Sequence, residues 1–120
     1  MCYSLSMLEI RYYVATSGHE PFAEWFAELD AAAAAKIARA LARMEQGNLS
    51  NVKSVGEGVL EYRVDFGPGY RIYFGRDGET IIILLTGGAK KRQQRDIDTA
   101  HASWRDYKRS RRGRVRTDGD

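Results

Sequence analysis

Two arginines near a tight turn are the residues of this 120-residue chain whose types and spacing most clearly suggest chemistry. Arg63 and Arg71 stand on either side of the turn Gly67-Pro68-Gly69, and Tyr73 follows Arg71 by two positions. Alternate residues of a β-strand point to the same face, so all three side chains are predicted to share one face of a hairpin. Guanidinium groups bind phosphates, and an exposed ring stacks on an unpaired base. This face is therefore suited to RNA.

The register of the hairpin follows from the length of its turn. A turn of three residues places Phe66 opposite Tyr70 on the apolar face, and it leaves Asp65 on the face of the two arginines. A one-residue bulge at the turn would upset this register. The alternative for the polar face is structural: the arginines would pair with Asp65 or Glu61 on an exposed surface without binding a ligand.

Basic residues are concentrated in the last part of the chain. Residues 1–88 contain 8 Lys/Arg and 11 Asp/Glu, whereas residues 89–120 contain 11 Lys/Arg and 5 Asp/Glu. Cations that contact phosphates release counterions, so this asymmetry favours a polyanionic partner. The alternative is a solvated helix followed by a disordered tail. Five further lysines and arginines are candidates for the site: Lys53, in the polar segment 48–58, and Lys90, Lys91, Arg92 and Arg95 after the last predicted strand.

The sequence lacks the signals that are typical of several classes of protein. The longest apolar runs, Ile81–Leu85 and Ala31–Ala35, are far shorter than the roughly 20 residues that span a bilayer. Cys2 is the single cysteine and can form no internal disulfide, and neither His19 nor His101 has zinc-ligand spacing. No phosphate-binding loop or secretory signal is visible. We therefore expect a cytoplasmic protein with no metal, no cofactor and no membrane contact.

The N-terminal half is predicted to contain a strand and a helical hairpin. Residues 7–14 are rich in β-forming types. Pro21 suits the first position of a helix whose apolar residues repeat at helical spacing. They are Phe22, Trp25, Phe26 and Leu29. Asp30 can cap a second helix over residues 31–46, and Gly47 can end it. We expect the aromatic face of the first helix to pack into the core; its alternative is a partner-binding face.

The C-terminal half is predicted to be a β-meander followed by a helix. The three strands are residues 59–66, 70–75 and 80–86. The chain leaves the sheet at Gly87-Gly88 and forms a helix within residues 90–108. The order β-α-α-β-β-β-α predicts an α+β fold: a mostly antiparallel four-stranded sheet packed by the helical hairpin and the C-terminal helix. We expect one domain over residues 1–108 and a basic, disordered tail over residues 109–120.

Two long segments carry a resemblance to a known family. Residues 61–74 (EYRVDFGPGYRIYF) and 82–97 (IILLTGGAKKRQQRDI), together with Glu-Pro-Phe-x-x-Trp at 20–25, resemble the RelE/ParE superfamily of type II toxin–antitoxin toxins. They are most similar to its HigB-like branch, the addiction module killer proteins, and the resemblance covers residues 8–107. It implies a RelE-like fold and a toxin held inactive in a hetero-oligomer by a cognate helix-turn-helix antitoxin.

The resemblance also implies a reaction and its residues. Most studied members cut mRNA in the ribosome without a metal: the ribose 2′-hydroxyl attacks the adjacent phosphorus, and cations hold the negative phosphorane. Arg71 matches the phosphate-stabilising arginine, Arg63 the first basic position of the preceding strand, and Lys90 and Lys91 the basic residues after the last strand. Asp65 departs from the pattern, because the best-known members have a lysine there. RNA contacts would come from Tyr73, Arg92, Arg95 and Lys53.

Two other functions remain compatible with the resemblance. The ParE branch poisons DNA gyrase and is not a nuclease. A degenerate toxin would act only as a co-regulator that binds operator DNA together with its antitoxin. The sequence therefore predicts a ribosome-dependent endoribonuclease that inhibits translation, with these two alternatives open.

Overall fold

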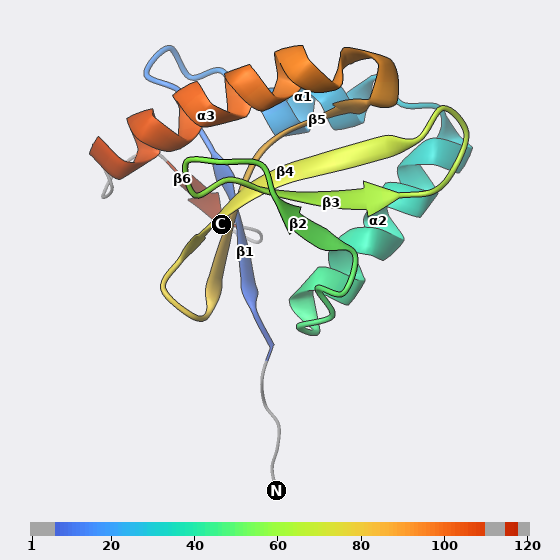
Figure 1. Ribbon diagram of the computed structural model, residues 1–120, viewed down its shortest axis with the longest axis horizontal. Helices are drawn as coiled ribbons and strands as arrows, with labels where there is room; N and C mark the ends of the chain where they lie inside the picture. The colour runs from blue at the N-terminus through green and yellow to red at the C-terminus, as the bar shows by residue number, and fades with distance from the viewer. Residues whose placement is uncertain (1–6, 110–114, 118–120) are drawn as a thin grey trace, which may run out of the picture.

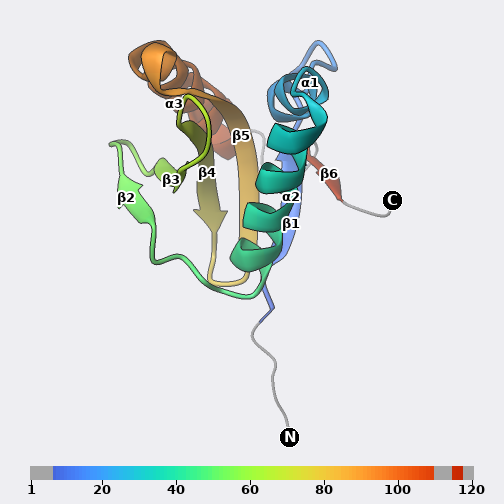
Figure 2. The same cartoon turned by 90° about the vertical axis from the view of Figure 1, so that its right-hand side faces the viewer.

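Helices flank both faces of a β-sheet in the computed structural model, which describes residues 7–109 and 115–117 (Figure 1). The elements occur in the order β1 (Glu9–Tyr13), α1 (Pro21–Ala27), α2 (Ala31–Glu45), β2 (Val52–Ser54), β3 (Leu60–Val64), β4 (Tyr70–Asp77), β5 (Ile81–Ala89), the 3-10 helix η1 (Lys90–Arg92), α3 (Gln93–Arg109) and β6 (Val115–Thr117). Figure 2 shows α3 on one side of the sheet and α1 and α2 on the other. The predicted α+β class is confirmed.

The sheet has six strands in the spatial order β2-β3-β4-β5-β1-β6. β1 runs parallel to β5, and the other neighbouring strands are antiparallel. The sequence predicts four of these strands. It misses β2, inside the segment 48–58 that reads as a loop, and β6, inside the segment 109–120 that reads as disordered. Each has three residues, too few for an alternating pattern to be recognised. The other residues after Arg109 lie outside the described part of the chain.

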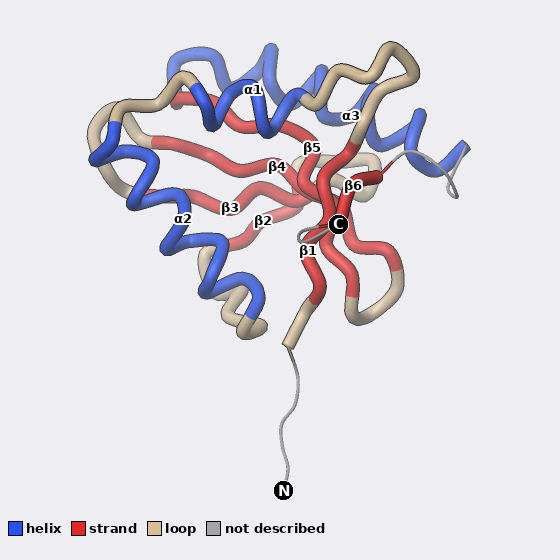
Figure 3. Tube along the Cα trace, turned by 180° about the vertical axis from the view of Figure 1, so that it is seen from behind, coloured by secondary structure: helices blue, strands red, loops and turns tan. Residues whose placement is uncertain are grey.

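The aromatic face of α1 belongs to the core. Pro21 is the first residue of the helix, as predicted, and the side chain of Phe22 is fully enclosed. Three further apolar residues of this segment pack against the same cluster: Trp25, Phe26 and Leu29. Figure 3, seen from behind, shows α1 and α2 together on this side of the sheet. The core-packing interpretation is therefore confirmed.

Both ends of α2 lie where the sequence predicts them. The carboxylate of Asp30 accepts a hydrogen bond of 2.8 Å from the N–H of Ala33. At the other end Gly47 adopts a φ of 83°, a left-handed conformation that glycine adopts without steric cost. Its N–H donates to the carbonyl of Met44. These end contacts fix the length of the helix.

Replacing Asp30 by alanine should lower the free energy of unfolding by about 1 kcal/mol, because the N–H of Ala33 then loses its acceptor. Chemical denaturation monitored by circular dichroism measures this change. Asp30→Asn retains a side-chain acceptor and should lose much less. Equal losses for the two variants would contradict the capping role.

β5 is covered on both faces, as its continuous apolar run predicts. Ile82 and Leu84 join the core on the side of α1 and α2, whereas Ile83 and Leu85 join the core on the side of α3. All four side chains are fully buried. A strand with apolar residues on both faces belongs in the interior of a sheet, and β5 lies between β4 and β1.

Trp104 anchors α3 to the sheet. Its ring stacks on Tyr107, with centroids 5.3 Å apart and an interplanar angle of 7°. It lies directly on Gly75 of β4, where a Cβ atom would come within 2.5 Å of the indole. Close approach of a ring to a strand therefore requires glycine at this position.

Within the described ranges, neither α3 nor any other helix is long and apolar enough to cross a membrane.

The β3–β4 hairpin has the predicted faces but a register shifted by two residues. Arg63 lies directly opposite Arg71, and Phe66 lies in the turn instead of opposite Tyr70. The predicted three-residue turn is wrong, because residues 65–69 all leave the strands. The glycines on both sides of the proline adopt positive φ values of 55° and 81°, which widens the turn. A shift by two residues preserves the alternation, so the arginines still share a face.

Gly87 and Gly88 continue the strand and do not end it. Both are buried within β5, which runs on to Ala89. A Cβ atom on Gly87 would lie 2.3 Å from the ring of Trp25, and one on Gly88 would lie 1.9 Å from the carboxylate of Asp96. The predicted chain exit here is therefore wrong. The two glycines admit side chains from α1 and α3 on opposite faces of the strand.

Candidate functional site

Two rows of paired residues, two positions apart along the strands, position the polar side chains on the α3 face of the sheet. One row pairs Arg63 of β3 with Arg71 of β4 and continues to Gly88 of β5. The next row pairs Lys53 of β2 with Glu61 of β3 and continues to Tyr73 and Thr86. Paired residues of neighbouring strands point to the same side, so both rows project toward α3.

Lys90 joins the arginine row from the segment after β5. Its backbone N–H donates a hydrogen bond of 2.8 Å to the carbonyl of Gly69, in the turn that precedes β4. Nη1 of Arg71 donates to the same carbonyl at 3.3 Å. The turn thus brings Lys90 beside Arg71, across from Arg63. We call Lys53, Arg63, Arg71 and Lys90, together with the Glu61 carboxylate, the cationic site.

Glu61 is the acidic centre of the cationic site. Its side chain has no exposed surface, and Oε2 lies 3.7 Å from Nε of Arg71. Oε1 lies 3.9 Å from Nζ of Lys53. Nε2 of Gln93, the first residue of α3, donates a hydrogen bond of 2.8 Å to Oε2. One buried carboxylate therefore links three separate segments of the chain.

The cations differ in how much of each side chain solvent reaches. The side chain of Arg71 is 10% exposed, whereas that of Lys53 is 58% exposed. Arg63, Lys90 and Lys91 are also exposed, and Lys91 shares the 3-10 helix η1 with Lys90. The cationic site therefore has a fixed inner guanidinium and an outer set of solvated cations. Such an arrangement suits a ligand with several anionic oxygens.

Tyr73 cannot stack on a base, contrary to the prediction. Its side chain is completely buried in the core beneath α3. Burial, and to a lesser extent the negative charge of Glu61, raises the pKa of the phenol well above its usual value. The alternation of β4 places Tyr73 on the same face as Arg71, as predicted. The sequence does not show that α3 covers this part of the face. The phenol therefore stays protonated at neutral pH and inaccessible to RNA.

Arg92 and Arg95 lie at a different place from the cationic site. They line a groove of about 500 Å³ between α1, the end of β5 and the start of α3. Glu24 of α1 and Glu28, which directly follows this helix, line the same groove, so its charge is mixed. Burial raises the pKa of Asp96 there, while Arg92 and Arg95 act in the opposite direction. The groove shares Gly88 with the arginine row, but none of the described residues that line it is a cation of the cationic site.

A hollow of about 350 Å³ adjoins the outer side of the cationic site. Lys53 and Arg63 line it together with the polar residues Ser50 and Asn51 and the acidic residue Asp65. Its size falls in the range of pockets that hold small ligands. The hollow therefore extends the cationic site away from α3 along the β2 edge of the sheet.

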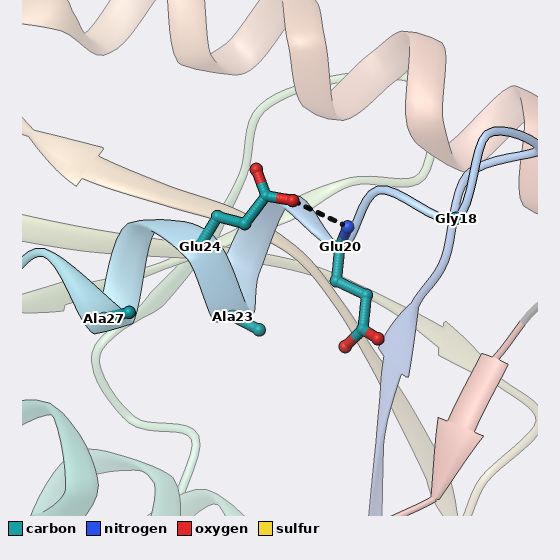
Figure 4. Close-up of a pocket in the computed structure, with 5 residues that line it drawn as sticks. All are labelled: Gly18, Glu20, Ala23, Glu24 and Ala27. Carbon is teal, nitrogen blue, oxygen red and sulfur yellow. Dashed lines mark hydrogen bonds between the residues drawn. The ribbon is translucent and has the colours of Figure 1, made fainter.

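A second depression, on α1, has the opposite chemistry. It is lined by Gly18, Glu20, Ala23, Glu24 and Ala27 (Figure 4). One carboxylate oxygen of Glu24 accepts a hydrogen bond of 3.3 Å from the N–H of Glu20, as the dashed line in Figure 4 marks. Acidic side chains beside small apolar ones offer nothing to a phosphate. This depression is unsuited to an anionic ligand.

Sequence reasoning missed Glu61 and Gln93 as members of the site. From the sequence, Glu61 is predicted only as a partner in an exposed ion pair, and no pattern points to Gln93. The strand alternation that selected Arg63 applies equally to Glu61, two positions earlier. What the sequence could not supply is the burial of that carboxylate, because burial depends on Gln93 and the start of α3 closing over it.

Comparisons with known proteins cover the segments that build the site. The family described as "Phage derived protein Gp49-like (DUF891)" matches residues 24–105, which include β2 to β5 and most of α3. A protein of Haemophilus influenzae (strain ATCC 51907 / DSM 11121 / KW20 / Rd), described as "Uncharacterized protein", is 40% identical over 80 residues. These residues are 66% of this chain and 81% of the relative.

Proposed function

The chain belongs to the Gp49-like family of phage-derived proteins, which is associated with toxin–antitoxin systems, and we propose that it is a toxin that cleaves mRNA in the ribosome. We place it with the HigB-like branch of the RelE/ParE superfamily. The observation that carries the proposal is the cationic site, in which Arg63 and Arg71 lie opposite each other and the backbone N–H of Lys90 shares the Gly69 carbonyl with the guanidinium of Arg71.

The proposed reaction uses the 2′-hydroxyl of the substrate as nucleophile. Its oxygen attacks the adjacent phosphorus, the P–O5′ bond breaks, and the products are a 2′,3′-cyclic phosphate and a 5′-hydroxyl. The proton of the 2′-hydroxyl leaves to a base, and the 5′-oxygen takes up a proton. Lys90 and Lys91 carry N–H groups that can supply that proton.

Arg71 and Arg63 would stabilise the negative charge that gathers on the phosphorane. Arg71 is held in place before the substrate arrives, because Glu61 and the Gly69 carbonyl both contact its guanidinium. Preorganised cations lower the barrier most effectively, since they need not reorient as charge develops. Arg63 is more exposed and would contact a phosphate oxygen from the opposite strand.

The surroundings of the cationic site support a need for the ribosome. Among the described residues Met7 is the single exposed large hydrophobic side chain, and the rings nearest the cationic site are half-buried (Phe66 and Tyr70) or buried (Tyr73). Isolated RNA would therefore meet charge but no fully exposed ring on which its bases could stack. A ribosome that presents mRNA in a fixed conformation would supply the missing orientation. A cognate antitoxin, which the family implies, would keep this surface from the ribosome.

Expression of the chain without its antitoxin should arrest growth and produce discrete cuts within codons of translated mRNA. Primer extension on cellular mRNA maps the cuts, and co-expression of the antitoxin is the control. Purified protein that has been dialysed against a metal chelator before it is mixed with ribosomes should cut ribosome-bound mRNA equally well. DNA damage without mRNA cuts would favour gyrase as the target. Absence of toxicity with retained antitoxin binding would favour a co-regulator. Either result would refute the proposal.

A further inference from the structure

We propose that Glu61 is a positioning residue: it fixes the guanidinium of Arg71 for the reaction without touching the RNA. This inference deepens the proposed function and rests on it. Glu61 has no exposed surface, so a substrate cannot reach its carboxylate. Its effect on a phosphate must therefore pass through the cations that it holds.

The orientation of Arg71 depends on few contacts. Nη1 donates to the carbonyl of Gly69 at 3.3 Å, and Nε faces Oε2 of Glu61 at 3.7 Å. Nε has no hydrogen-bond partner among the described residues. Arg63 lies directly opposite on β3 and repels it. Without the carboxylate, a guanidinium next to another cation and held by one backbone carbonyl would turn toward solvent.

The same carboxylate holds the outer cations in register. Lys53 on β2 approaches Oε1, and Gln93 at the start of α3 donates to Oε2. Gln93 directly follows the 3-10 helix that carries Lys90 and Lys91. Glu61 therefore connects the β2 edge, the arginine on β4 and the basic segment after β5. These are three of the segments that form the cationic site.

A charge-based positioning role makes an unusual kinetic prediction. Glu61→Gln retains the shape of the side chain but removes its charge, so the site becomes more positive. The KM for ribosome-bound mRNA should stay equal or fall, because anion binding is not weakened. The kcat should fall ~10- to 100-fold, the scale expected when a reacting group is slightly misplaced. An ordinary binding residue would instead raise KM.

Glu61→Asp separates charge from packing. Aspartate keeps the charge but shortens the side chain, whereas glutamine keeps the size but loses the charge. Positioning by charge predicts that the Asp variant retains more kcat than the Gln variant. A purely structural role predicts the reverse order, because the Gln variant fills the same space. The observation of that reverse order would overturn the proposal.

The Nε–H resonance of Arg71 in a 15N-resolved NMR spectrum provides a readout besides activity. It should be resolved in the wild-type protein and shift or broaden in Glu61→Gln. Glu9→Gln is the matched control, because Glu9 pairs with Arg11 at 2.8 Å on an exposed part of β1. The Arg71 resonance and kcat should both be unchanged in that control. An unchanged Arg71 resonance in Glu61→Gln would refute the positioning role.

A second variant and the activity of the wild-type protein separate failure of this inference from failure to fold or failure of the proposed function. If Glu61→Gln does not fold, Gln93→Ala removes the hydrogen bond to Oε2 from a half-buried position and should disturb the same resonance. An undisturbed resonance in Gln93→Ala would then overturn the proposal. If the wild-type protein neither arrests growth nor cuts mRNA, the proposed function fails. The Arg71 resonance of the variants still decides whether Glu61 orients the guanidinium.

Discussion

Arg63→Ala should slow mRNA cleavage by about 100-fold, the scale expected when one donor to a charged transition state is removed. Arg63 lies opposite Arg71 and also lines the hollow beside the cationic site. Its loss therefore removes one of the two guanidinium groups that would contact the phosphate. The side chain is exposed, and the fold should tolerate alanine. Single-turnover cleavage of ribosome-bound mRNA measures the rate, and thermal unfolding checks the fold.

Arg39→Ala is the matched control for this substitution. Arg39 is an exposed arginine on α2, which covers the other face of the sheet, and its removal changes the net charge by the same amount. Equal rates for the two variants would show that only overall charge matters and would count against the site. Arg71→Ala is a poorer test, because it leaves the carboxylate of Glu61 buried without its guanidinium partner and endangers the fold.

Gly75→Ala should lower the free energy of unfolding by about 3 kcal/mol, at the upper end of the usual cost of overpacking a core. The new Cβ would lie 2.5 Å from the ring of Trp104. Trp104 is 6% exposed and stacks on Tyr107, so the ring cannot withdraw without displacing α3. Urea denaturation of the purified variant measures the loss.

A double variant identifies the cause of that loss. Gly75→Ala in a Trp104→Leu background should cost much less than in the wild-type background, because the smaller side chain leaves room for the methyl group. Gly78→Ala is a useful comparison: Gly78 has open space around it and a φ of 74°, so its cost is backbone strain alone. Equal costs of Gly75→Ala in the two backgrounds would contradict the steric explanation.

The sequence predicts those parts of the fold that have local causes. Pro21 and Asp30 mark helix starts by their own chemistry, and the apolar run 81–85 marks a strand covered on both faces. β2 and β6 escaped prediction because strands of three residues are stabilised by their neighbours and carry little pattern of their own. The hairpin turn was predicted too short, because a Gly-Pro-Gly sequence is compatible with turns of more than one length.

The candidate site shows the same division. Alternation along β3 and β4 placed Arg63 and Arg71 on one face, and this survived the shift in register because the shift was even. The burial of Tyr73 and Glu61 depends on where α3 begins and how it crosses the sheet. Those are contacts between distant segments, and no local pattern encodes them. Whether Arg92 and Arg95 face the cationic site likewise depends on how the 3-10 helix η1, which carries Lys90 and Arg92, leads into α3.

The place of β1 in the sheet has a consequence for biosynthesis. This strand leaves the ribosome before the helices and the first strands of the meander, yet its neighbours β5 and β6 are made after them. It must wait unpaired while the helices and the meander emerge, since pairing between distant segments is slow to form. A half-made chain therefore lacks a finished sheet. The sheet is complete only after the last strand has emerged and paired with β1.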